Sequence, residues 1–215
     1  MKMIRDNYEQ LSREIGDQAV LIAVTKYHSV EDALTAYDAG IRHFGESRIE
    51  GFLEKREALP EDAEVHFIGT LQSRKVKDVI DHLNYVHSLD RASVAKKIEQ
   101  YSSHTVKCFI QVNISGETTK HGLPPEEVPG FLEDMRAYSR VRIIGLMTMA
   151  PHTEDEAEIS EVFEQLGILR DSLRERNSGN IQVEELSMGM SNDYHIALRH
   201  GATYIRIGSK LMGSR

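Results

Sequence analysis

The stretch Val20-Leu21-Ile22-Ala23-Val24-Thr25-Lys26 is a short apolar, β-branched run that ends in a lysine. Such a run predicts a strand that is buried on both faces, as in parallel sheets covered by helices. An unpaired ammonium is costly inside such a strand, but α/β barrels and open α/β sheets place their ligands at the carboxyl ends of strands. Lys26 is therefore a candidate ligand-binding residue. The alternative is a strand-end lysine whose ammonium extends into solvent.

Short apolar runs and amphipathic segments alternate along the rest of the chain. After residues 20–26 the predicted strands are 42–45, 65–69, 85–88, 107–114, 141–147, 183–187 and 204–207. The predicted helices are 1–15, 30–39, 46–58, 76–82, 92–101, 124–138, 154–176 and 193–200. Ser29 and Asp32 have the spacing of a capping box, and Asp90 is a candidate N-cap for the helix at 92–101.

About eight strand-helix units with short connections predict a (β/α)8 TIM barrel with an additional N-terminal helix, as a single domain over residues 1–215. A doubly wound open sheet is the alternative, because alternation alone does not show whether the sheet closes.

The composition is that of a globular protein, with 40% hydrophobic and 28% charged residues in a chain of 215. The net charge of −8 argues against a nucleic-acid partner. No signal peptide or membrane-spanning pattern is found, so we expect a cytoplasmic protein. Cys108, the single cysteine, lies in an apolar strand and is predicted to be buried and inert. His66 and His87 are interpreted as hydrogen-bonded core residues, and no histidine pair has metal-site spacing.

Two loops near the carboxyl terminus contain small, hydroxyl-bearing residues. Ser187 ends one strand and leads into Met188-Gly189-Met190-Ser191-Asn192-Asp193, and the final strand leads into Gly208-Ser209. In α/β barrels the loops after the last two strands commonly hold a phosphate. Glycine allows the backbone to approach an anion, and serine adds a hydroxyl at a helix start. The pair predicts a phosphate site; the alternative is that Gly189 and Gly208 only permit tight turns.

Arg206 stands between two isoleucines in the last strand, and alternation places it on the opposite face, toward the barrel interior. A buried guanidinium needs acceptors. These are supplied either by a bound ligand or by a carboxylate of the barrel such as Glu46. Together with Lys26 and the two loops, an inward Arg206 predicts a site for a phosphorylated aldehyde.

Six segments resemble the pyridoxal-phosphate homeostasis protein family, in order and over nearly the whole chain. They are Ile22-Ala23-Val24-Thr25-Lys26, His43-Phe44-Gly45-Glu46-Ser47, His66-Phe67-Ile68-Gly69-Thr70-Leu71-Gln72, Gly145-Leu146-Met147-Thr148-Met149, Leu186-Ser187-Met188-Gly189-Met190-Ser191 and Ile205-Arg206-Ile207-Gly208-Ser209. The family is similar in fold to the barrel domain of alanine racemase. Ser47 and Arg74 depart from the family pattern, which has asparagine at both positions.

The resemblance implies that pyridoxal 5′-phosphate (PLP) is the cofactor, bound as an internal aldimine at Lys26. It also implies that Ser191, Gly208 and Ser209 receive the phosphate and that Arg206 faces the pyridine nitrogen. Met147 and Ser187 complete the predicted set of cofactor-binding residues, since a methionine thioether packs well against an aromatic ring.

Three functions are compatible with these residues. The resemblance favours a PLP carrier that buffers or delivers the cofactor, with transient apoenzyme partners and no efficient catalysis. The alternatives are a PLP-dependent amino-acid racemase with weak activity and a barrel enzyme that acts on another phosphorylated carbonyl compound. A two-base racemase needs an acid or base on each face of the cofactor, and the chain ends at Arg215, directly after the last predicted strand, with no second domain to supply one. We therefore expect a monomeric carrier.

Overall fold

The computed structural model describes residues 2–213 and shows eight parallel strands that close into a barrel in chain order. The last strand pairs with the first, with Leu21 opposite Ile205. The strands are β1 (Val20–Val24), β2 (His43–Glu46), β3 (Glu64–Phe67), β4 (Tyr85–Leu89), β5 (Val106–Gln111), β6 (Val141–Met147), β7 (Ile181–Met190) and β8 (Tyr204–Ile207). The predicted TIM barrel is confirmed, and the open-sheet alternative is wrong.

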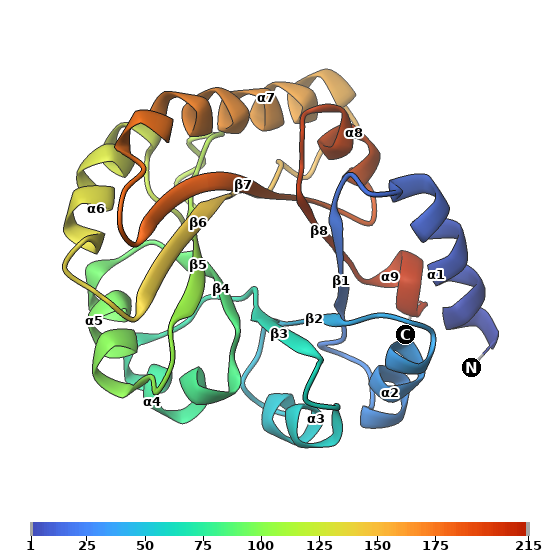
Figure 1. The fold of residues 1–215 in the computed structure, drawn as a ribbon. Coiled ribbons are helices and arrows are strands. Elements are labelled where there is room, and N and C mark those ends of the chain that lie inside the picture. The colour runs from blue at the N-terminus through green and yellow to red at the C-terminus, as the bar shows by residue number, and fades with distance from the viewer. Residues whose placement is uncertain (1, 214–215) are drawn as a thin grey trace.

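Helices form a ring outside the strands (Figure 1). They are α2 (Val30–Asp38), α3 (Phe52–Ala58), α4 (Val76–Val79), α5 (Ala92–Tyr101), α6 (Val128–Met135), α7 (Glu156–Leu173) and α8 (Tyr194–Arg199). Single 3-10 turns are η1 (Ser73–Lys75), η2 (Ile80–His82), η3 (Pro125–Glu127) and η4 (Arg174–Arg176). The predicted N-terminal helix is α1 (Lys2–Ile15), while Met1 lies outside the described residues. It packs beside α9 (Ser209–Met212), where Asn7 Nδ2 donates to the Leu211 carbonyl at 2.9 Å.

Local sequence signals explain several boundaries. The capping box at α2 is confirmed: Ser29 Oγ accepts from the Asp32 amide, and the Asp32 carboxylate accepts from the Ser29 amide. The predicted cap at Asp90 is wrong, because Arg91 is the N-cap of α5. The Asp90 carboxylate accepts instead from the Gly122 amide at 3.2 Å, so a tertiary contact competes with the local cap.

The bounds of β1 to β4 differ from the predicted ranges by one or two residues, and those of β5 and β7 differ by up to three. β5 ends at Gln111 rather than Ile114, because the chain turns there into a loop held by Asn113 Nδ2, which donates to the Glu117 carbonyl. β7 continues three residues beyond Ser187. Its register on β8 shifts between Ser187 and Met190, and Gly189 adopts a φ of 96° at this bulge.

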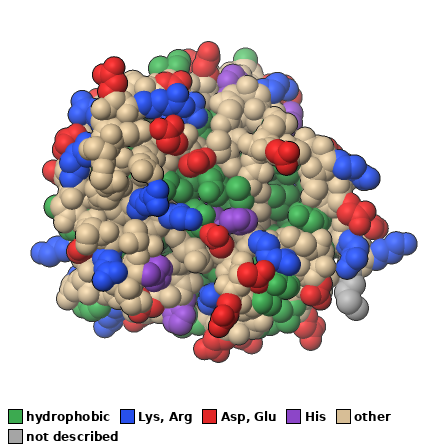
Figure 2. All heavy atoms as spheres, viewed as in Figure 1, with side chains coloured by type: hydrophobic (Ala, Val, Ile, Leu, Met, Phe, Trp, Pro, Cys, Tyr) green, Lys and Arg blue, Asp and Glu red, His purple; other side chains and the backbone are tan. Residues whose placement is uncertain are grey.

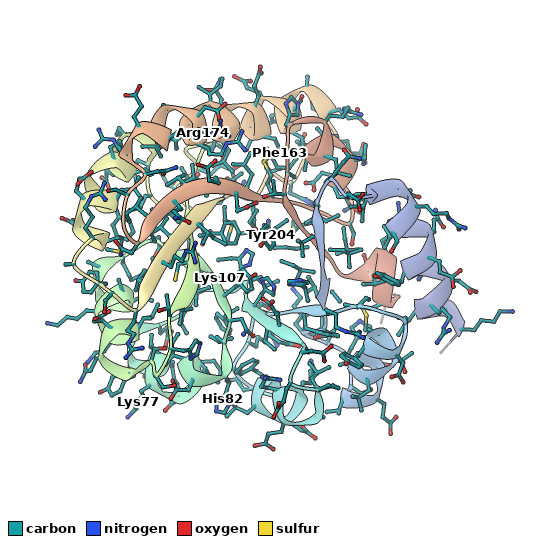
Figure 3. All side chains as sticks on the ribbon, in the orientation of Figure 1. Lys77, His82, Lys107, Phe163, Arg174 and Tyr204 are labelled. Atoms are coloured by element: carbon teal, nitrogen blue, oxygen red, sulfur yellow. The ribbon has the colours of Figure 1, made fainter. Side chains whose placement is uncertain are left out.

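Apolar side chains fill the space between the strands and the outer helices. A second, smaller cluster of Tyr85, Phe109, Ile144 and Met147, with Tyr204 against it, lies apart from this core. Tyr204 and Lys107 point into the barrel in Figure 3. Figure 2 shows hydrophobic side chains at the centre of the same face, over the barrel, with basic and histidine side chains beside them.

Cys108 in β5 is fully buried, as expected, and burial raises the pKa of its thiol. Among the helices of residues 2–213, none is both long and apolar enough to cross a membrane.

Candidate functional site

A cavity of about 1370 Å³ opens at the carboxyl-terminal ends of the strands. Five of the seven predicted site residues line it, and they come from the ends of three strands and the loops that follow: Lys26, Ser191, Arg206, Gly208 and Ser209. Parallel strands deliver their terminal residues to one rim, which is why positions far apart in the chain meet here. Ser47, one of the two departures from the family pattern, also lines this cavity.

Lys26 lies two residues beyond the end of β1, and its side chain is exposed while it lines the cavity. Its Nζ is 4.8 Å from the centroid of the Tyr27 ring. The same ring has the Arg48 guanidinium at 5.3 Å.

The backbone just before Lys26 is held by a buried ion pair. Lys55 Nζ on α3 lies 2.8 Å from Glu46 Oε1, with side-chain exposures of 9% and 3%. Lys55 also donates to the Thr25 carbonyl, and the Thr25 hydroxyl donates to Glu46 Oε1. Glu46 is thus the partner of Lys55. The alternative in which Glu46 pairs with Arg206 is wrong.

Ser191 connects the two loops that are predicted to hold a phosphate. Its Oγ accepts from the backbone amide of Gly208 at 3.2 Å and from that of Lys210 at 3.4 Å. The second loop begins α9, so Gly208 is the N-cap of that helix. Ser191, Gly208 and Ser209 all line the cavity, and their two hydroxyls are donors suited to an anion.

Lys210 fixes α9 from the outside. Its Nζ donates to the Tyr194 hydroxyl at 2.5 Å and lies 3.6 Å from Glu14 Oε2 of α1. The Tyr194 hydroxyl donates to the same carboxylate. These contacts raise the pKa of Lys210 and lower that of Glu14. They tie α1, α8 and α9 together behind the rim.

Arg206 points inward, as alternation predicts, and is 3% exposed. Its guanidinium donates to Ser187 Oγ at 2.5 Å and to the Thr148 carbonyl at 3.1 Å. Burial lowers its pKa to about 10, and the Asp193 carboxylate opposes this shift. A guanidinium carries five N–H donors, so after two protein acceptors further donors remain for a ligand in the cavity.

Met147 and Ser187 lie outside the cavity lining. Met147 packs in the small cluster with Tyr85 and Phe109, and Ser187 is fully buried against Arg206. Ser187 therefore reaches the cavity only through the guanidinium. Sequence reasoning missed Thr148, whose carbonyl holds Arg206, because a backbone acceptor leaves no residue-type signal.

Three histidines form a hydrogen-bonded row in the barrel interior, which agrees with the core interpretation of His66 and His87. His43 Nδ1 lies 2.9 Å from His66 Nε2, and His66 Nδ1 lies 2.8 Å from His87 Nε2. Burial lowers the pKa of His43 and lowers the pKa values of His66 and His87 well below 6.5. Within residues 2–213 no group of three histidine, cysteine or acidic residues is arranged to hold a metal ion.

The buried histidines predict a loss of stability below about pH 6.5. Their unfolded forms bind protons there while the folded forms stay neutral, so the unfolding free energy falls by up to about 1.4 kcal/mol per pH unit for each imidazole. Urea unfolding at pH 7, 6 and 5 measures this slope. His66→Phe should reduce it, and His195→Gln, at an exposed histidine, should not. A flat wild-type profile over this window, which lies above most carboxylate titrations, would contradict the prediction.

The family model of the alanine racemase N-terminal domain matches residues 1–215, so the chain is a barrel of that class. A protein of Aquifex aeolicus named pyridoxal phosphate homeostasis protein is 38% identical over 201 residues, covering 92% of this chain and 87% of that protein. The chain belongs to the pyridoxal phosphate homeostasis protein family.

Solved structures agree with this assignment. PipY of Synechococcus elongatus without PLP has a TM-score of 0.92 at 32% identity, covering 98% of this chain and 100% of PipY. PipY with PLP bound has a TM-score of 0.88 at 31% identity over the same shares. Alanine racemase of Corynebacterium glutamicum, at 15% identity and a TM-score of 0.80, shares the fold; this chain covers 62% of it and is itself covered completely.

Proposed function

We propose that this chain binds PLP in the 1370 Å³ cavity and serves PLP homeostasis by storing and delivering the cofactor, without efficient turnover of its own. The observation that carries the proposal is that Lys26, Arg206 and the Ser191–Gly208 contact line one cavity. The PLP bound to PipY, a protein of the same fold, supports it.

The donor set of the cavity fits the three functional groups of PLP. When bound, PLP supplies an aldehyde that accepts an amine, a phosphate dianion and a pyridine nitrogen. Lys26 contributes the amine for a covalent bond to the aldehyde. Ser191 and Ser209 donate their hydroxyls to the phosphate, Gly208 lets the backbone approach it, and Arg206 directs a remaining N–H at the ring nitrogen. Ser187 and Met147 support the site from below, through Arg206 and through the interior packing.

Two features disfavour efficient catalysis. A guanidinium at the ring nitrogen cannot give up a proton at ordinary pH, so the ring stays unprotonated and is a weak electron sink. Lys26 is also exposed at the rim, and water access works against carbanion chemistry. The racemase alternative is thereby reduced to weak side activity, and no feature favours a different phosphorylated carbonyl compound.

An open rim suits a carrier. Tyr27 and Met190 line the cavity with exposures of 54% and 40%, so an apoenzyme can reach its mouth. We propose transient contact with PLP-dependent apoenzymes, a monomeric single domain and a cytoplasmic location.

A binding and turnover experiment tests the proposed function. The protein is incubated with PLP, freed of unbound ligand, scanned for visible absorbance, reduced with borohydride and digested. We expect a visible band and a PLP-modified peptide containing Lys26, with alanine racemisation near the buffer rate. Absence of the band and of any modified peptide would reject PLP binding, and rapid racemisation would reject the carrier role in favour of the racemase.

Ser191→Ala is predicted to weaken the binding of PLP selectively. The variant loses the Oγ that joins the two loops, which is one hydrogen bond to a charged phosphate and the alignment of two amides. We expect about a tenfold to hundredfold loss of PLP affinity and less than about a threefold loss for pyridoxal, which lacks the phosphate. Equal losses for both ligands in equilibrium titrations would place the phosphate elsewhere.

A further inference from the structure

A continuous row of hydrogen bonds crosses the barrel interior from the cavity to its opposite end. Arg206 NH1 donates to Ser187 Oγ at 2.5 Å, and Ser187 Oγ lies 2.7 Å from His87 Nδ1. His87, His66 and His43 then follow at 2.8 and 2.9 Å. His43 lines a second cavity of about 440 Å³, between α1 and the starts of β1 and β2. The row therefore joins two cavities at opposite ends of the barrel.

Arg206 decides the direction of every hydrogen bond in this row. A guanidinium only donates, so Ser187 Oγ accepts from it. Within residues 2–213 the structure gives the buried Ser187 hydroxyl no acceptor other than His87 Nδ1, so the hydroxyl donates there. A neutral imidazole that accepts at Nδ1 carries its proton on Nε2. His87 thus donates to His66, and His66 donates to His43.

The surroundings keep the imidazoles neutral and fixed in orientation. His66 stacks on Tyr85 with centroids 4.0 Å apart, and His87 stacks on Phe109 at 4.4 Å. The charged groups that act on His43 are Glu64 of β3, which raises its pKa, and Lys107 of β5, which lowers it. At the other end burial lowers the pKa of His87, and the charge of Arg206 lowers it further.

We propose that His87, backed by His66 and His43, is a positioning residue for Arg206. His87 Nδ1 accepts the hydrogen bond of the Ser187 hydroxyl and so keeps a lone pair of Ser187 Oγ turned to the guanidinium, which stays aligned with the cofactor ring nitrogen. Because all hydrogen bonds in the row run in one direction, the orientation of the Arg206 guanidinium is coupled to the tautomer of His43 at the second cavity. The role of His87 toward the ring nitrogen rests on the proposed function, whereas the direction of the hydrogen bonds in the row does not.

Long-range ¹H–¹⁵N spectra of the ligand-free protein at pH 7 test the direction, with each imidazole assigned by its own His→Gln variant. We expect the Nε2–H tautomer at His43, His66 and His87. In Ser187→Ala, which removes the donor to His87, we expect mixed tautomers at all three. An Nδ1–H tautomer at any of them in the wild type, or unchanged His66 and His43 in Ser187→Ala, would overturn the proposal.

Ligand binding tests the positioning role. His87→Phe, which keeps an aromatic ring against Phe109, should weaken PLP retention about tenfold, the effect of one lost hydrogen bond to a charged group. His87→Phe should change the retention of a PLP analogue with C–H in place of the ring nitrogen by less than about twofold. His87→Asn, which keeps an acceptor near the Nδ1 position, should restore PLP retention. Equal losses of retention for PLP and the analogue, or failure of His87→Asn to retain PLP, would show that His87 has only a structural role. If the wild type binds no PLP, the proposed function fails, and the tautomer spectra still test the direction of the hydrogen bonds in the row.

Discussion

Lys26→Ala is expected to abolish the visible band of the PLP complex and to leave no borohydride-fixed adduct. The variant removes the amine, so the remaining contacts are hydrogen bonds, each contributing about 0.5–1.5 kcal/mol. Retention after dialysis should fall by at least about 100-fold. The free energy of unfolding should change by less than about 0.5 kcal/mol, because Lys26 is exposed and its ammonium lies over the Tyr27 ring.

Two matched variants separate the amine from the charge at this position. Lys26→Arg keeps a cation over the Tyr27 ring but has no nucleophilic form at ordinary pH, so it should also lack the band. Lys96→Ala removes another exposed lysine, on α5, and should retain the full band. A band of wild-type intensity in Lys26→Ala would show that another lysine holds the aldehyde. Lys55 is then the first candidate, because it approaches the Thr25 carbonyl.

Strand-end residues were predictable because a parallel barrel brings all its strand ends to one rim. Lys26, Ser191 and Arg206 follow from that rule together with side-chain alternation. The bounds of β6 and β8 match the predicted ranges, since apolar runs bounded by turn residues mark them clearly. PLP itself did not follow from patterning and depended on the resemblance to a family.

Contacts between residues far apart in the chain explain the features that could not be predicted from the sequence. Gly189 resembles a loop residue, yet a bulge keeps it in β7, where an added Cβ would lie 2.6 Å from the Ala197 Cβ. Met147 lies at a strand end like Lys26, but it packs into the interior cluster rather than the cavity. Lys55 is one of several charged residues on α3, and only the closed barrel shows that it turns toward Glu46.

Glu46→Leu is expected to cost about 3–5 kcal/mol of unfolding free energy, because it leaves the Lys55 ammonium buried without its counter-charge. The carboxylate also accepts from the Thr25 hydroxyl, so the residue after β1 loses one contact and Lys55 loses another. Lys26 follows directly, and we expect weaker PLP retention in the fraction that stays folded. Urea unfolding and the visible band measure the two effects separately.

The double variant Glu46→Leu/Lys55→Met tests whether the loss comes from the unpaired charge. Replacing both members of a buried ion pair by apolar residues of similar volume is commonly close to neutral. Here the Thr25 carbonyl and hydroxyl lose their partners, at about 1–3 kcal/mol for each group left unsatisfied. The double variant should therefore be more stable than Glu46→Leu and less stable than the wild type. If the loss in the double variant equals the sum of the losses in Glu46→Leu and in Lys55→Met measured alone, Glu46 and Lys55 are not energetically coupled. Their geometry beneath Lys26 would then reflect packing alone.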